Sequence, residues 1–318
     1  MICDAGGCTG NVCGFDEPRW FEQKSAIFSA GLRDMDAILG RDDRLVAKLA
    51  DVVQKIDATF VAVIGTPVPA VIATDYLALK RMSEKKIKLP ILTVDTDGME
   101  LYDKGEEKAF LELFKIFAIE KYQAEEDRIG ILGMTPQDVS DLDAADKIRD
   151  LYQQKYGKQA VCYCMGDGLE EIREASSVSR NIVVSPAALM TAKYLEKTFG
   201  TPYEIHYPLV DELIPDVDYT GKEVLIVHQQ VIANSIRKEL LKKGAKRVRI
   251  VSWFMMKKEL LADGDVLLRD EDAYIELVQN GDFDIIFADG CMERMIPEFK
   301  GIFVDTRHFA VSGKLIGK

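Results

Sequence analysis

The sequence predicts an α/β protein built from three stacked, Rossmann-like parallel-sheet domains. Apolar runs of strand length alternate with segments of helical period along the whole chain, and this alternation is typical of βαβ units. The chain has 318 residues, which is too long for one ordinary hydrophobic core. We therefore expect domains at residues 1–124, 125–218 and 219–318.

The first domain is predicted to contain three buried strands and three helices. The strands are expected at residues 2–5, 59–64 and 90–94, and the helices at 43–56, 71–85 and 106–119. Residues 123–128 are polar and are predicted to form a linker to the second domain.

The other two domains follow the same plan. In the second, strands are expected at residues 129–133, 159–164 and 181–184, and helices at 144–156 and 187–199. Gly200 followed by Pro202 indicates the end of the second helix. In the third, a helix ends at Gly244 and strands are expected at 224–227, 249–252, 284–288 and 302–305. Because ligands of such sheets bind beyond the carboxyl ends of the strands, function is sought in the loops that follow them.

Composition excludes several classes of partner. Asp and Glu outnumber Lys and Arg by 53 to 41, and there is no Lys/Arg-rich cluster, which argues against nucleic-acid binding. The most apolar run, residues 58–73, contains Pro67 and Pro69 and is too short to cross a bilayer. Without a signal peptide the protein is expected in the cytoplasm, with its six cysteines reduced.

The common catalytic motifs are missing from the sequence. Neither G-x-G-x-x-G nor G-x-x-x-x-G-K-[ST] occurs, so NAD or ATP binding by this chain is not expected. The three histidines form no H-E-x-x-H pair, and no G-x-S-x-G turn is present. Zinc hydrolases and serine hydrolases are therefore disfavoured.

The first thirteen residues are rich in cysteine and glycine. Cys3, Cys8 and Cys13 have C-x4-C-x4-C spacing. Thiolates on a glycine turn can approach an iron–sulfur cluster while backbone amides donate hydrogen bonds to its sulfurs. The alternative is that they are ordinary reduced thiols. Three more cysteines are predicted to be core residues, namely Cys162, Cys164 and Cys291.

Five segments occur in the order found in nitrogenase component 1 subunits and resemble them. The first is the Gly-Cys turn at residues 7–11, which carries Cys8. The others lie at residues 28–40, 64–75, 94–105, and 181–184 together with 199–202. The likeness covers nearly the whole chain.

The resemblance implies a three-domain subunit that pairs with a like or related component 1 subunit. It also implies an iron–sulfur cluster, of the 4Fe-4S type, at the subunit interface, and electrons from a separate ATP-dependent iron protein. Cys8 matches the family's Gly-Cys ligand, with Cys3 and Cys13 as further candidates. Thr66 stands where the family has its Cys-Pro cysteine. The family's first cluster cysteine has no counterpart, and we hypothesise that a segment precedes Met1.

Two more residues are candidates for chemistry. His308 lies near the position of the family's cofactor histidine and could bind a metal or donate a proton; the alternative is a histidine that only makes structural hydrogen bonds. Asp97 could act as an acid or ligand beside the cluster, or could be a solvated turn carboxylate. The stretch around Ser185 lacks the family's cofactor cysteine, which argues against dinitrogen reduction.

The leading functional hypothesis is a subunit of a nitrogenase-like two-component reductase. It would receive low-potential electrons through the interface cluster and reduce a small molecule. One alternative is a non-catalytic scaffold that holds or assembles a metallocluster for another protein. A second is a binding subunit without a cluster, which Thr66 favours.

Overall fold

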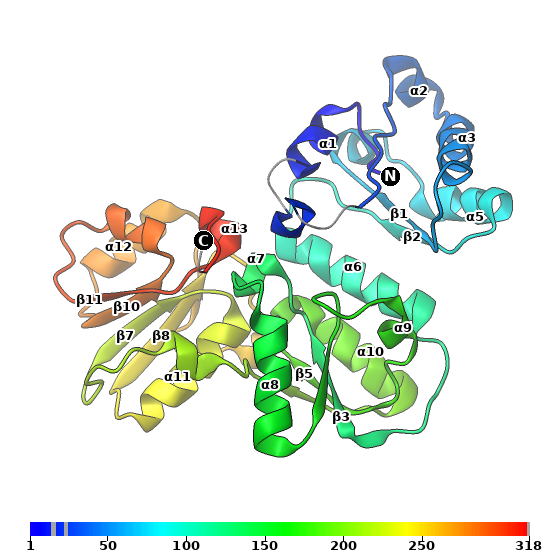
Figure 1. Cartoon of the computed structure of the whole chain (residues 1–318). Coiled ribbons are helices and arrows are strands. Elements are labelled where there is room, and N and C mark those ends of the chain that lie inside the picture. Colours follow the sequence, from blue (N-terminus) through cyan, green and yellow to red (C-terminus); the bar gives the residue numbers. More distant parts are fainter. Residues whose placement is uncertain (14–16, 22–24, 317–318) are drawn as a thin grey trace. The chain divides into compact units, whose positions relative to one another are not determined.

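The computed structural model describes residues 1–13, 17–21 and 25–316 (Figure 1). The chain divides into two compact units, Met1–Ile119 and Glu120–Lys318. Every strand pairing within the sheets is parallel, and helices alternate with the strands, so the predicted α/β fold is confirmed.

The first unit is built on a small parallel sheet. β1 (Val61–Ile64) pairs with β2 (Ile91–Val94), and Ile2 forms single bridges to Ser29 and Ile64. α5 (Tyr76–Ile87) and α6 (Tyr102–Phe117) pack against β2. The described residues of this unit also form the helices α1 (Gly7–Asn11), η2 (Pro18–Phe21), α2 (Asp34–Leu39), α3 (Asp42–Val53) and α4 (Pro67–Val71).

Two expected elements of this unit are wrong in detail. The predicted strand at residues 2–5 is reduced to the bridges of Ile2, because the chain turns after Asp4 into α1. The predicted helix at 71–85 is interrupted, since Ala73 has a left-handed φ of 54°. α5 then starts afresh at Asp75, whose carboxylate accepts hydrogen bonds from the backbone N–H groups of Leu77 and Ala78.

The second unit contains two parallel sheets, and the first has strand order β4-β3-β5-β6. Its strands are β3 (Glu125–Leu132), β4 (Gln159–Cys162), β5 (Val178–Val183) and β6 (Tyr203–Ile205). The helices are α7 (Pro136–Val139), α8 (Ala144–Tyr156), α9 (Leu169–Arg173) and α10 (Leu189–Phe199). The predicted linker at 123–128 is wrong, because β3 already begins at Glu125.

The second sheet of this unit has strand order β11-β10-β7-β8-β9. Its strands are β7 (Glu223–Val227), β8 (Arg247–Ser252), β9 (Val266–Leu267), β10 (Ile285–Ala288) and β11 (Ile302–Asp305). The helices are α11 (Gln230–Lys242), α12 (Glu271–Gln279) and α13 (Phe309–Ser312). One hydrophobic core includes Ile131 of β3 and Phe287 of β10, so both sheets are packed as a single unit.

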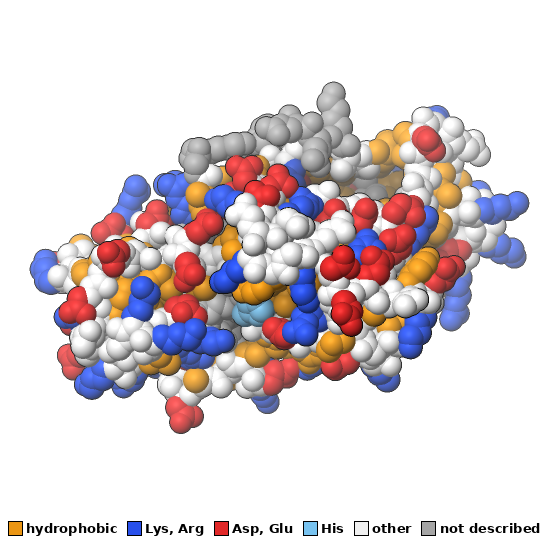
Figure 2. Space-filling view, turned by 60° about the horizontal axis from the view of Figure 1, so that its bottom comes forward, with side chains coloured by type: hydrophobic (Ala, Val, Ile, Leu, Met, Phe, Trp, Pro, Cys, Tyr) orange, Lys and Arg blue, Asp and Glu red, His pale blue; other side chains and the backbone are white. Residues whose placement is uncertain are grey.

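Charged side chains of both signs are mixed over the face shown in Figure 2. Acidic and basic groups alternate there with small apolar areas, as expected of a solvated surface. Within the described parts of the chain, no helix combines the length and the apolar character needed to cross a membrane.

Candidate functional site

The Gly-Cys turn is held by the carboxylate of Asp4. Its Oδ2 accepts hydrogen bonds from the backbone N–H of Thr9 at 2.8 Å and from the Thr9 hydroxyl at 2.9 Å. Its Oδ1 accepts one from the Ser29 hydroxyl at 2.6 Å. In the sequence Cys8 lies between Asp4 and Thr9, at the start of α1. The position of its thiol therefore depends on the conformation of the turn.

Asp4 is only 1% exposed, yet its carboxyl favours the ionised form. Burial alone raises the pKa of Asp4, and the hydrogen bonds from Ser29 and Thr9 outweigh it, so the pKa is lowered overall. A buried carboxylate satisfied by several donors is a rigid anchor for the backbone that donates to it.

The three N-terminal thiols lie in different surroundings. Cys8 is half-buried and Cys13 is exposed. Cys3 is 2% exposed, and burial raises its pKa to about 12. Because the thiolate is the form that binds metal, Cys3 is poorly suited as a ligand, whereas Cys8 and Cys13 can be reached from outside.

Thr66, at the end of β1, has a structural contact of its own. Its hydroxyl donates a hydrogen bond of 2.6 Å to the backbone carbonyl of Cys3, and the side chain is buried. Next to it, Gly65 leaves no room for a side chain, because a Cβ there would lie 2.3 Å from the carbonyl oxygen of Thr96. The Thr66 side chain thus ties β1 to the segment that leads into the Gly-Cys turn.

The turn fits one ligand position of an iron–sulfur cluster. Among the residues that the structure describes, an added Cβ at Gly6, Gly7 or Gly10 would meet no atom within 4 Å, so these residues leave the backbone beside Cys8 uncovered. Over residues 1–13, 17–21 and 25–316, however, no three His, Cys, Asp or Glu side chains are grouped as a metal site. In the described residues Cys8 and Cys13 are thus accessible thiols that suit a cluster, without a complete set of ligands around them.

Asp97 lies in the loop after β2 and closes a tight turn. Its Oδ1 accepts hydrogen bonds from the backbone N–H groups of Met99 at 2.8 Å and Glu100 at 3.2 Å. These two bonds lower the pKa of the Asp97 carboxyl. This geometry corresponds to the turn carboxylate that the sequence left open as the alternative.

His308 lies in the second unit and is 1% exposed. Its ring stacks on His228 with centroids 4.5 Å apart, and its Nε2 lies 3.7 Å from Oδ1 of Asp138. Its backbone N–H donates to Oδ2 of Asp289 at 2.9 Å, and Phe254 covers it edge-on. The side chain is therefore part of a packed polar cluster.

Sequence reasoning missed His228, the partner in this stack. Its Nδ1 accepts a hydrogen bond from the backbone N–H of Gln229, which leaves Nε2–H to donate to the carbonyl of Arg307 at 3.2 Å. Burial, and then the neighbouring His308, lower the pKa of His228 to about 3. The available signal was that each histidine follows a predicted strand of the same domain.

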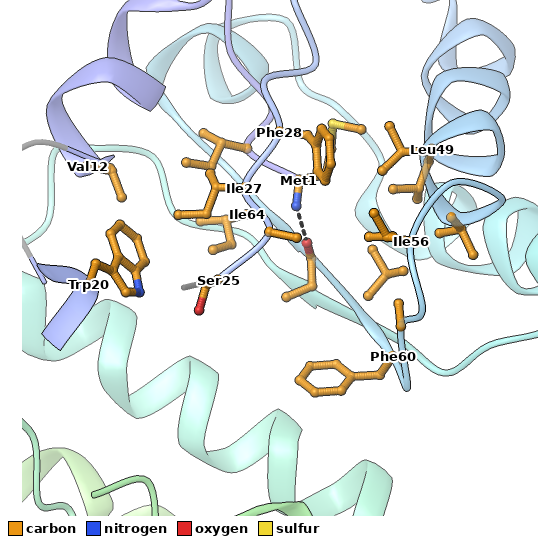
Figure 3. A pocket seen from close by; sticks show the side chains of 17 residues that line it. Met1, Val12, Trp20, Ser25, Ile27, Phe28, Leu49, Ile56, Phe60 and Ile64 are labelled. Carbon is orange, nitrogen blue, oxygen red and sulfur yellow. Dashed lines mark hydrogen bonds between the residues drawn. The ribbon is translucent and has the colours of Figure 1, made fainter. Parts of the chain in front are cut away.

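An apolar cavity of about 310 Å³ lies beside the Gly-Cys turn in the first unit. Figure 3 shows Phe28, Leu49 and Phe60 lining one side of the cavity, and Val12 and Trp20 lining the opposite side, near α1. Met1 and Ala62 also line the cavity, and the amino group of Met1 donates a hydrogen bond of 2.7 Å to the carbonyl of Ala62.

Solved structures support the fold. The structure "Nitrogenase Cp1 at pH 6.5" aligns over 97% of this chain and 83% of its own, with a TM-score of 0.70 at 13% identity. "Nitrogenase Cp1 at pH 5" aligns over 98% and 79%, with a TM-score of 0.71 at 15% identity. At such low identity the likeness establishes the fold alone.

Sequence relatives cover part of the chain. The "Nitrogenase iron-molybdenum cofactor biosynthesis protein NifE" of Clostridium pasteurianum is 29% identical over 181 residues, which is 55% of this chain and 38% of the relative. The protein of the same name from Bradyrhizobium diazoefficiens (strain JCM 10833 / BCRC 13528 / IAM 13628 / NBRC 14792 / USDA 110) is 22% identical over 185 residues, or 55% and 32%. The matches thus span about a third of these relatives' length.

The family predicted from the five segments is confirmed by a direct match. The sequence model of the family "Nitrogenase component 1 type Oxidoreductase" matches residues 6–211, more than half of the chain. The match begins at Gly6, directly before the Gly-Cys turn, and includes Thr66 and the first sheet of the second unit. The chain therefore belongs to the nitrogenase component 1 type oxidoreductase family.

Proposed function

We propose that this chain is a metallocluster-holding subunit that serves as a scaffold in cofactor biosynthesis, with Cys8 as a cluster ligand. The observation that carries the proposal is a half-buried thiol on an uncovered glycine turn, in a chain whose sequence relatives are named as cofactor biosynthesis proteins. A bound iron–sulfur cluster would supply one-electron chemistry.

The arrangement of the other candidates favours a scaffold over a catalyst. Asp97 is engaged in a turn, and His308 is buried against His228. A general acid must reach the group that it protonates, whereas the Asp97 carboxylate holds a turn and the His308 ring is buried. Holding a cluster requires thiolates and a partner surface, but it does not require a general acid.

The cluster is proposed to be shared with a second component 1 type subunit. Cys8 supplies one ligand, Cys13 is close in sequence and exposed, and Cys3 is buried with a raised pKa. Thr66 has no thiol. The remaining ligands then come from a second copy of this chain or from a related subunit.

A second candidate function is the electron-accepting reductase subunit. The description of the family as an oxidoreductase favours it. In this case an ATP-dependent iron protein would reduce the cluster, and the electrons would pass on to a small molecule. MgATP-dependent reduction of the cluster by such an iron protein, followed by consumption of a substrate, separates the reductase from the scaffold.

The first prediction is that Cys8→Ala removes the cluster. The chain is purified anaerobically, reconstituted with ferrous iron and sulfide, and assayed for bound iron, labile sulfide and an electron paramagnetic resonance signal. We expect the unaltered chain to hold a reducible cluster in a dimer, and the variant to lose most of the iron, because Cys8 supplies a metal–thiolate bond.

Cys291→Ala is the matched control. Cys291 is half-buried like Cys8, but it lies in the second unit after β10, and its substitution should leave the iron content unchanged. Equal iron in the unaltered chain and in Cys8→Ala would refute Cys8 as a ligand. Failure of the unaltered chain to bind iron, both alone and when co-expressed with a component 1 subunit, would refute the cluster itself.

A further inference from the structure

Asp4 joins two segments that the sequence presents as separate motifs. Through Oδ2 it holds Thr9 in the Gly-Cys turn, and through Oδ1 it holds Ser29 in the segment 28–40. Ser29 in turn accepts a hydrogen bond from the backbone N–H of Gly31 at 3.0 Å. One carboxylate therefore fixes the distance between the turn that carries Cys8 and the segment beside it.

The backbone around Asp4 is also held by hydrogen bonds. Its carbonyl accepts a hydrogen bond of 2.8 Å from the N–H of Leu32, and the neighbouring Cys3 N–H donates to Ile64 at 2.8 Å. The Thr66 hydroxyl holds the Cys3 carbonyl on the same stretch. The backbone of Asp4 is thus fixed at the edge of the sheet by bonds that do not involve its side chain.

We propose that Asp4 is a positioning residue for Cys8, acting through Thr9 to set the conformation of the Gly-Cys turn in which the cluster ligand lies. The inference rests on the proposed function, because positioning matters only if Cys8 is a ligand. Its basis is geometric: the residue directly after Cys8 donates both its backbone N–H and its hydroxyl to the same buried oxygen.

The chemistry of the contacts predicts a graded response to substitution. The groups that hydrogen-bond to the Asp4 side chain are donors: the backbone N–H groups of Gly6 and Thr9, and the hydroxyls of Thr9 and Ser29. An asparagine can keep its oxygen toward Thr9 and turn its NH₂ toward the Ser29 hydroxyl, which can accept. An alanine removes all of these bonds. Asp4→Asn should therefore preserve much of the turn that Asp4→Ala releases.

The test has an arm that needs no metal. In the metal-free chain, hydrogen exchange is followed over peptides covering residues 5–13, together with the rate of Cys8 alkylation by iodoacetamide. For Asp4→Ala we expect exchange at Thr9 to accelerate about tenfold or more, since a bond to a charged acceptor is lost, and Cys8 alkylation to accelerate with it. Asp4→Asn should fall between this variant and the unaltered chain.

The second arm reads the cluster itself. After reconstitution with iron and sulfide, Asp4→Ala should show shifted and broadened paramagnetic resonance features, which a loss of global stability alone would not cause. Ser29→Ala is the control, because it removes a contact to Asp4 but leaves both bonds from Thr9 in place. It should match the unaltered chain in both arms.

The outcomes separate the two proposals. If Cys8→Ala abolishes the cluster while Asp4→Ala and Asp4→Asn keep unaltered Thr9 exchange and resonance features, the role of Asp4 is refuted and the proposed function stands. If Cys8→Ala keeps the cluster, the proposed function fails, and the positioning role falls with it even where Thr9 exchange changes. If Asp4→Ala does not fold, Asp4→Asn is compared with Ser29→Ala instead. Faster Thr9 exchange and altered resonance features in Asp4→Asn but not in Ser29→Ala would support the role of Asp4, and equal behaviour of the two variants would refute it.

Discussion

Gly130→Ala is expected to lower the free energy of unfolding of the second unit by about 3 kcal/mol, the upper end of the usual cost of overpacking a core. Gly130 lies in β3, between Val161 of β4 and Asn181 of β5. A Cβ at this position would lie 2.2 Å from Oδ1 of Asn181 and 2.8 Å from the ring of Tyr163. Both neighbours are fully buried, so neither can move aside without disturbing the sheet.

Tryptophan fluorescence can measure this loss in the second unit alone. The chain has two tryptophans, Trp20 in the first unit and Trp253 in the second, so a Trp20→Phe background reports urea unfolding of the second unit. Gly168→Ala is the control, because its nearest neighbour would be the Glu171 carboxylate at an ordinary 3.5 Å. Similar losses in the two variants would contradict the packing argument.

The second unit is also expected to lose stability in mild acid through His228. In the folded state burial holds the pKa of His228 near 3, against an ordinary value of 6.5. Above pH 6.5 the ring is neutral whether the chain is folded or not. Below it the unfolded chain takes up a proton that the folded chain does not, so stability falls. Between pH 6.5 and 5 this linkage costs about 2 kcal/mol.

Neighbouring groups define the pH window for this experiment. His308, Asp138 and Asp289 surround His228. The pKa of Asp289 is lowered, because hydrogen bonds outweigh its burial, so its contribution is lost only below about pH 4. Burial also lowers the pKa of His206, which adds a smaller loss of the same sign.

Urea unfolding at pH 7, 6 and 5, followed by Trp253 fluorescence, measures the effect. His228→Gln can still donate to the Arg307 carbonyl but does not titrate, so its stability should vary much less with pH than that of the unaltered chain. His206→Gln should keep most of the original dependence. An unchanged slope in His228→Gln would show that another group takes up the proton.

The parallel α/β class and most strand positions could be predicted because buried strands of such sheets are continuous apolar runs. Residues 224–227 and 285–288 are of this kind, and they lie in β7 and β10. The prediction begins this strand at residue 129 instead of 125, because Glu125 to Asp127 are charged and exposed and the local composition there indicates a linker. Tertiary pairing overrides that local preference.

The candidate site can be read from the sequence only in part. Cys8 could be proposed as a ligand because a thiol in a glycine turn is visible in a linear pattern. Asp4 could not be proposed from the sequence, because the turn that brings Thr9 onto its carboxylate and the contact from Ser29, 25 residues away, appear only in the fold. The stack of His228 and His308 joins residues that follow β7 and β11, two strands separated by β10, and only the strand order brings them together. A single sequence carries little information about such contacts.

Ser140 has a consequence for the order in which the chain can fold during synthesis. Its hydroxyl donates to the carbonyl of Arg307 and accepts from the N–H of Phe309, and its carbonyl accepts from Ile316. These partners are translated about 170 residues later. The end of α7 therefore cannot complete these contacts until the distant segment leaves the ribosome. During this interval its polar groups bond to water in an incompletely packed chain, a state that is exposed to aggregation and to chaperones.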